Sequence, residues 1–95
     1  MSRVVASQTW QLSLPGCASL KEKRSVVRSL KDRLHKRFSL SVAETGVQDV
    51  LTRAEISVAL VASDRRFAEM VLDKADRLVQ ENGRAVVLDT RRDIL

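Results

Sequence analysis

This chain of 95 residues has few of the residues that mark specialised sites: three aromatic residues, one histidine, one cysteine and one proline. Cys17 has no second cysteine to join, so an internal disulfide is excluded, and one cysteine with one histidine cannot supply a zinc-ligand set. We expect no metal and no cofactor. No apolar run approaches the roughly 20 residues that a membrane helix needs. Met1-Ser2-Arg3 leads into no signal-peptide core, so we expect a cytoplasmic protein.

Positive charge is concentrated in one stretch of the chain. Eight of the 17 Lys and Arg residues lie between Ser19 and Phe38, where Glu22 and Asp32 are the only acids, so this stretch carries +6. The other 75 residues carry −1, and the whole chain has a formal charge of +5. A hydrophobic content of 44% with 31% charged residues is that of a globular protein, and the length predicts one domain, residues 1–95.

The spacing of apolar residues predicts six elements in the order strand, helix, strand, strand, helix, strand. They are expected at residues 4–14, 19–38, 39–43, 53–62, 63–80 and 85–88, with 89–95 as a charged tail able to prolong the last strand. Two right-handed βαβ units that share a sheet form an α+β, ferredoxin-like βαββαβ sandwich. We therefore predict a four-stranded antiparallel sheet with both helices on one face.

Both helices carry an apolar stripe and a start signal. Ser19 to Glu22 is a capping box, and Ser63-Asp64 supplies capping oxygens for the second helix. The pair Asn82-Gly83 is typical of a left-handed helix end. The apolar stripe of the first helix is expected at Leu20, Val27, Leu30, Leu34 and Phe38.

The sheet face away from the helices is predicted to carry the odd-numbered residues of the first and third strands. These are mostly small and polar: Val5, Ser7, Thr9, Gln11, Ser13, Glu55, Ser57, Ala59 and Val61. Small side chains allow a second sheet to approach closely, which favours a homodimer surface, while their polarity equally suits exposure to solvent.

Several short sequence motifs occur together along the chain. They are Leu14-Pro15-Gly16, Ser19–Arg24, Ser29–Leu34, Arg37-Phe38, Ser41–Glu44, Gln48-Asp49 and the closing Ile94-Leu95. In this combination the chain resembles, nearly end to end, the YlxP-like family, a small bacterial family of unknown function. The resemblance implies a ferredoxin-like fold, no established activity and an association with RNA or the ribosome. It provides no catalytic residue.

The basic helix presents an ordered set of cations. At 100° per residue, Lys21, Arg24, Arg28, Lys31 and His35 share one flank at steps of three and four residues. Neighbours at these steps lie about 5–6 Å apart, which suits successive phosphates of a nucleic acid. The predicted phosphate contacts are Lys21, Lys23, Arg24, Arg28, Lys31 and Arg37. An ordinary solvated helix has the same pattern, and the sequence leaves both interpretations open.

Outside the basic helix, the sequence offers one possible loop site and no pattern typical of base stacking or catalysis. Gln48 and Asp49 form a possible loop site between the second and third strands, although Asp also caps turns locally. The three aromatics, Trp10, Phe38 and Phe67, are all expected on core faces, which argues against base stacking on the sheet. No arrangement of nucleophile, acid and base is apparent, so we expect a protein that is not an enzyme.

The leading hypothesis is therefore a binding module, as a homodimer, whose basic helix contacts structured RNA or a ribosomal surface. One alternative is a homodimeric interaction module whose basic helix binds an acidic protein. A second alternative is a small-molecule-sensing dimer, which would need a pocket with convergent polar groups.

Overall fold

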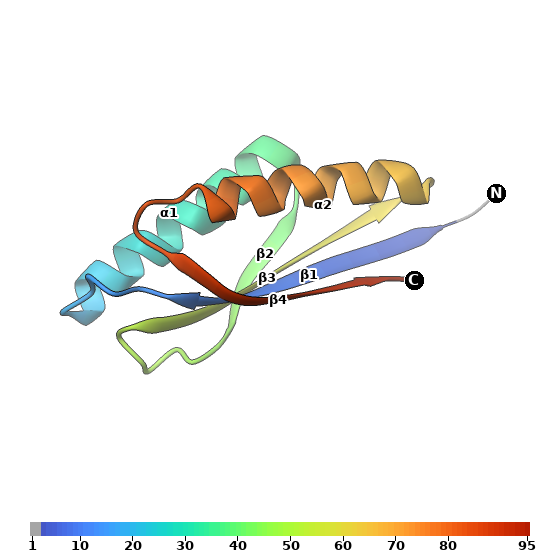
Figure 1. Ribbon diagram of the computed structural model, residues 1–95. Helices are drawn as coiled ribbons and strands as arrows, with labels where there is room; N and C mark the ends of the chain where they lie inside the picture. The colour runs from blue at the N-terminus through green and yellow to red at the C-terminus, as the bar shows by residue number, and fades with distance from the viewer. Residues whose placement is uncertain (1–2) are drawn as a thin grey trace.

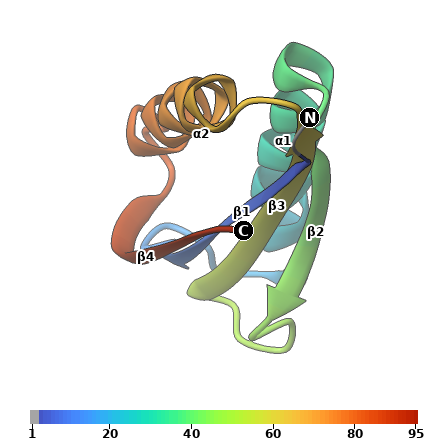
Figure 2. The same ribbon diagram turned by 90° about the vertical axis from the view of Figure 1, so that its right-hand side faces the viewer.

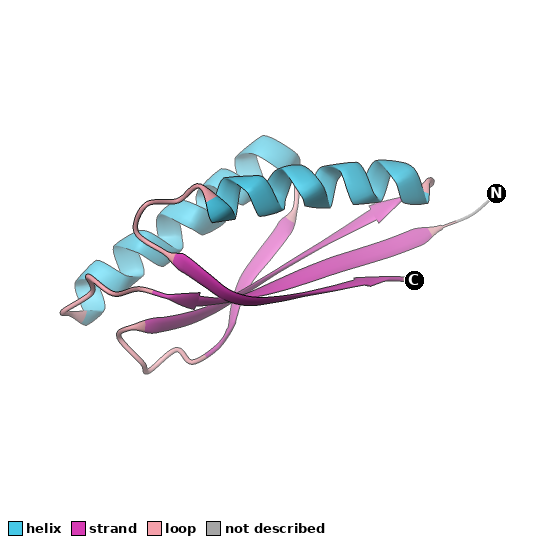
Figure 3. Cartoon of the chain, viewed as in Figure 1, coloured by secondary structure: helices cyan, strands magenta, loops and turns pink. Residues whose placement is uncertain are grey.

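The computed structural model describes residues 3–95 and has the predicted βαββαβ order (Figure 1). The elements are β1 (Val4–Ser13), α1 (Leu20–Phe38), β2 (Ser41–Gly46), β3 (Arg53–Ala62), α2 (Arg65–Gln80) and β4 (Val86–Ile94). The four strands form one antiparallel sheet in the order β2-β3-β1-β4, which is the ferredoxin-like arrangement. Helices and strands form separate layers (Figure 3). The predicted fold class is confirmed.

Both helices cover the same face of the sheet (Figure 2). In this end-on view α2 lies over the side of β4, and α1 lies over the side of β2 and β3. The core between the layers takes the even-numbered residues of β1, among them the fully buried Trp10 and Leu12. From β3 it takes Ile56 and Val58. The strand phase predicted from the period-two pattern is therefore correct.

Strand β4 extends beyond the apolar segment at 85–88 that predicted it and includes most of the charged tail. The charged residues of the tail continue the pairing with β1, from Gln11 opposite Asp89 to Ala6 opposite Ile94. Main-chain bonds between Val5 and Leu95 extend the pairing by one more residue. An edge strand exposes its side chains, so charged residues are compatible with it and discourage further strand addition.

The ends of the helices show which local signals were correct. Ser19 Oγ accepts from Glu22 N at 3.2 Å, and the Glu22 carboxylate accepts from Ala18 N, one residue before the N-cap, so both side chains of the predicted capping box bond main-chain amides at the helix start. The left-handed cap predicted at Asn82-Gly83 is wrong, because no glycine among residues 3–95 has a positive φ. Instead α2 ends at Gln80, and its C-cap residue Glu81 has a right-handed conformation in which the Glu81 N–H still donates to carbonyls of the helix.

The buried stripe of α1 differs from the predicted one at its start. Leu20 is exposed, whereas Lys23, Val26 and Val27 are buried with the next apolar residues, Leu30 and Leu34. The other buried positions lie three, four, seven and eleven residues after Lys23, so Lys23 occupies a place where the helix pattern calls for an apolar side chain.

The prediction that every aromatic residue lies in the core is also wrong. Phe67 is 51% exposed, while Ala68, Val71, Leu72 and Ala75 take up the buried face of α2. Phe67 satisfies the helical spacing but lies in the first turn, at the end of the helix layer.

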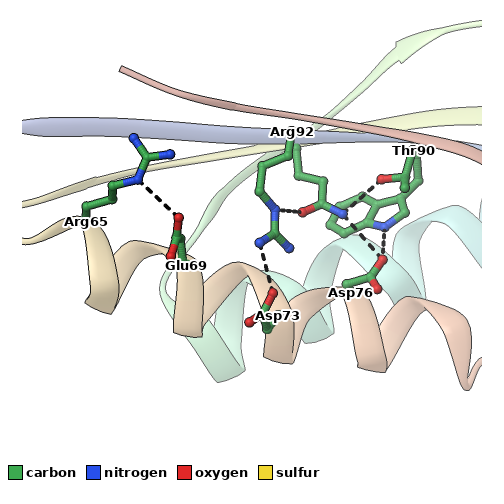
Figure 4. Close-up of polar contacts among 8 residues, drawn as sticks. Arg65, Glu69, Asp73, Asp76, Thr90 and Arg92 are labelled. Atoms are coloured by element: carbon green, nitrogen blue, oxygen red, sulfur yellow. Dashed lines mark hydrogen bonds and ion pairs between the residues drawn. The ribbon is translucent and has the colours of Figure 1, made fainter.

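A cluster of hydrogen bonds and one ion pair connects α2 to β1 and β4 of the sheet (Figure 4). Trp10 Nε1 donates to Asp76 Oδ1 at 2.9 Å, and the buried Gln8 donates to Thr90 Oγ1 at 2.9 Å. Arg92 Nε donates to Gln8 Oε1 at 2.8 Å and pairs through Nη1 with Asp73 at 2.9 Å. These bonds satisfy the buried polar groups of β1, which makes their burial tolerable.

Candidate nucleic-acid interface

The exposed surface of α1 is strongly cationic. Seven of its eight Lys and Arg residues form no ion pair within residues 3–95: Lys21, Arg24, Arg28, Lys31, Arg33, Lys36 and Arg37. Set against Glu22 and Asp32, these seven leave +5 on the helix surface. Because the protein's own carboxylates do not neutralise this charge, it is available to a partner.

Lys23 does not belong to this surface, which corrects its prediction as a phosphate contact. The residue is 2% exposed, and its ammonium group points toward the β2–β3 loop, at residues 47–52. Nζ donates to the carbonyls of Val47 at 2.6 Å, Gln48 at 3.2 Å and Val50 at 2.7 Å. A phosphate has no access to it.

Glu44 on β2 supplies the charge that balances Lys23. Its Oε2 lies 3.3 Å from Nζ and is enclosed, yet it accepts no hydrogen bond from residues 3–95. An ammonium group has three N–H donors, and the three loop carbonyls take all of them. The carboxylate therefore interacts with Lys23 through charge attraction alone.

This arrangement fixes the shape of the β2–β3 loop. Three carbonyls that would otherwise point into solvent converge on one buried cation. Val47, at the start of the loop, has a φ of 50°, a conformation that a β-branched residue rarely adopts. The lysine bonds offset the cost of that conformation, as expected where surrounding contacts determine the backbone.

The fixed loop brings the two predicted sites together. A cavity of about 560 Å³ lies between α1 and the loop, with Arg24, Arg28 and Lys31 on the helix side and Gln48 and Asp49 on the loop side. Gln48 Nε2 donates to the main-chain carbonyl of Glu44 at 3.2 Å, so its amide is partly engaged within the loop. The cavity wall is mixed in charge rather than purely cationic.

The remaining member of the predicted cation row has a structural contact. His35 Nδ1 lies 2.9 Å from the carbonyl oxygen of Leu40, and the His35 carbonyl accepts from Ser39 N at 2.9 Å. Ser39 has the left-handed conformation, with a φ of 55°. His35 therefore helps to end α1 and lead the chain into β2.

The open face of the sheet carries a chain of hydrogen bonds. Thr9 and Ser57 are 2.8 Å apart, Ser57 and Thr45 are 2.7 Å apart, and Thr45 donates to Glu55 at 2.6 Å. Gln11 donates to the same carboxylate. The bonds from Thr45 and then Gln11 lower the pKa of Glu55 below its ordinary value, because they stabilise the ionised form.

Fold and surface together define a ferredoxin-like domain with a cationic helix layer and a polar open sheet face. No helix within residues 3–95 is long and apolar enough to cross a membrane. The same part of the chain holds no group of three or more side chains suited to a metal ion.

The chain belongs to the family described as "Protein of unknown function (DUF503)", which matches residues 5–92. It is 38% identical over 56 residues to "Uncharacterized protein YlxP" of Bacillus subtilis (strain 168), a match that covers 59% of this chain and 61% of the relative. The resemblance to a YlxP-like family is thereby confirmed, and the family's function is unknown.

Two solved structures share the fold. A dimeric ferredoxin-like protein from an uncultured marine organism has a TM-score of 0.55 at 12% identity, with 99% of this chain and 96% of the other covered. The de novo designed protein Foldit4 also has a TM-score of 0.55, at 11% identity, covering 99% and 97%. At such low identity the likeness establishes the fold alone.

Proposed function

We propose that this protein is a non-enzymatic module that binds RNA, free or displayed on a ribosome, through the exposed cations of α1. The observation that carries the proposal is the set of seven Lys and Arg residues on one helix that form no ion pair with any described residue. Phosphate contacts are assigned to Lys21, Arg24, Arg28, Lys31 and Arg37. Contacts of this kind give affinity with little choice of sequence.

The salt dependence of binding follows from the number of contacts. Each phosphate contact contributes about −0.7 to −0.9 to the slope of log K against log salt, so five contacts give about −3.5 to −4.5. Between 50 and 200 mM salt the affinity should therefore fall by about 10² to 10³. A gel-shift titration with a structured RNA measures the slope directly, and no binding even at low salt would refute the proposal.

A matched pair of double variants separates a local site from net charge. Arg24→Glu with Arg28→Glu removes two assigned contacts, and Arg53→Glu with Arg84→Glu makes the same charge change at exposed residues elsewhere. We expect the first pair to lower the slope by about 1.4 to 1.8 and the second to leave it near the wild-type value. Equal effects of the two pairs would show that net charge, and not α1, determines binding.

We also propose that two copies associate through the open face of the sheet. Val5 and Val61, which are register partners, expose apolar surface there, and Val61 is 71% exposed. The neighbouring polar groups bond to one another, so covering them leaves few donors or acceptors unsatisfied.

The oligomeric state tests this second proposal. Sedimentation of Val61→Glu should show the monomer mass at concentrations where the wild type is a dimer, since a charge in the contact would have no partner. Val50→Glu, at an exposed valine of the β2–β3 loop, is the control. A monomeric wild type at high concentration would contradict the proposal.

A further inference from the structure

A groove separates the end of α1 from one side of α2. It has a volume of about 600 Å³, and its lining includes Arg37, Phe38, Phe67, Met70, Lys74 and Arg77. Phe67 is 51% exposed and Met70 42%, so the groove offers apolar surface to solvent. Two exposed apolar side chains in a concave site indicate that something can cover them.

The groove is cationic as well as apolar. Arg37, Lys74 and Arg77 line it without an ion pair to any described residue, and Glu81 is the only acid in its lining. The Arg37 guanidinium lies over the ring of Phe38, 5.8 Å from its centroid. The occupant of this groove must therefore combine a flat or apolar part with negative charge.

An unpaired nucleotide meets both requirements. Any of the four bases has a flat face that can stack on an aromatic ring, and the phosphate of the nucleotide pairs with nearby cations. A base inside a duplex presents no free face, which favours single-stranded RNA. A second copy joined here about a two-fold axis would bring the same three cations into contact with each other, so self-association through this groove is disfavoured.

We propose that Phe67 is a stacking platform for an unpaired base of RNA, with Arg37, Lys74 and Arg77 holding the adjacent phosphates. This inference rests on the proposed function and extends it, because it adds a base contact to the phosphate contacts of α1. Lys31 and Arg37 are six residues apart, or about 9 Å along the helix and about 120° around it. Arg24, Arg28 and Lys31 line the cavity beside the β2–β3 loop, whereas Arg37 lines the groove beside α2, so a strand that contacts both sets must pass around the end of α1.

The test compares two RNA strands with identical backbones. One is a hexamer of adenosine, and the other is the same hexamer without its bases. We expect wild-type protein to bind the hexamer with bases about 5- to 150-fold more tightly, which is the range for one stacked base. Phe67→Leu keeps an apolar side chain without an aromatic face, so it should bind the two strands almost equally.

Further variants keep the test decisive. Phe67→Trp should retain the preference for bases, while Val86→Leu, at another exposed apolar residue, should leave both affinities unchanged. Arg24→Glu with Arg28→Glu should weaken both strands by the same factor. An unchanged preference in Phe67→Leu, or poly-glutamate binding with the same dependence on Phe67, overturns the stacking site.

The two proposals fail in different ways. If wild type binds both strands equally and Arg24→Glu with Arg28→Glu abolishes binding, the stacking site is wrong and the phosphate-binding function stands. If wild type binds neither strand nor a structured RNA at low salt, the proposed function itself is wrong.

Discussion

Replacing Lys23 by methionine should destabilise the protein more than replacing any other lysine or arginine of α1, because Lys23 is the buried one. The substitution keeps an apolar chain of similar length but removes the cation that three loop carbonyls and Glu44 surround. Breaking a buried ion pair by removing one partner costs about 3–5 kcal/mol. The Glu44 side chain is 21% exposed, which lets water relieve part of the cost, so we expect about 3 kcal/mol. For a domain of this size that lowers the melting temperature by about 12–24 °C.

Urea denaturation and thermal melting followed by circular dichroism measure the loss. The control is Arg24→Met, one residue further along the helix and exposed, which should change stability by about 0.5 kcal/mol or less. Lys23→Met with Glu44→Gln should recover part of the loss, because the second change removes the uncompensated carboxylate. A Lys23→Met protein as stable as the Arg24→Met control would refute the buried cation. Amide exchange in the β2–β3 loop should also accelerate in Lys23→Met and not in the control.

Three more outcomes follow from single contacts. Asp76→Ala leaves the buried Trp10 Nε1 without its acceptor and should cost about 1–3 kcal/mol in urea denaturation, with Asp76→Asn costing less; equal costs for the two variants would contradict the bond. Val47→Gly relieves the φ of 50° and should stabilise the protein by about 0.5–1 kcal/mol, whereas a less stable variant would argue against strain there. Thr45→Val removes the main cause that lowers the pKa of Glu55, so that pKa should rise in an NMR titration. Because the folded pKa of Glu55 is lowered, its contribution to stability is present above the unfolded pKa and is lost as the pH falls through the folded pKa; in Thr45→Val this acid loss should be smaller and should be complete at a higher pH.

Local patterns were enough to predict the fold. The period-two alternation of β1 and β3 gave the correct buried face, since a one-residue shift would have turned every apolar side chain toward solvent. The capping box of Ser19 and Glu22 marked the start of α1, because its two bonds form within one turn. The end of α2 was predicted for the wrong reason, since Asn82-Gly83 permits a left-handed cap but does not require one.

For the candidate site, the sequence predicted the row of exposed cations but not the burial of Lys23. The row of Arg24, Arg28 and Lys31 follows from helix geometry, and these residues do line one cavity. Lys23 was assigned to the same surface because of its residue type, although its spacing of four and seven residues to Val27 and Leu30 places it on the apolar stripe. That spacing was the signal by which the sequence alone could have identified a buried lysine.

The amino-acid sequence by itself determined the order of elements, the face that each strand buries and the concentration of positive charge on α1. These depend on residue spacing along one element, which is a local property. Only the tertiary structure decided that Lys23 is enclosed by the β2–β3 loop and that Phe67 borders a cationic groove with Arg37. Both outcomes depend on contacts between segments that are far apart in the chain. The spacing of residues within one helix does not specify which other segment that helix will contact.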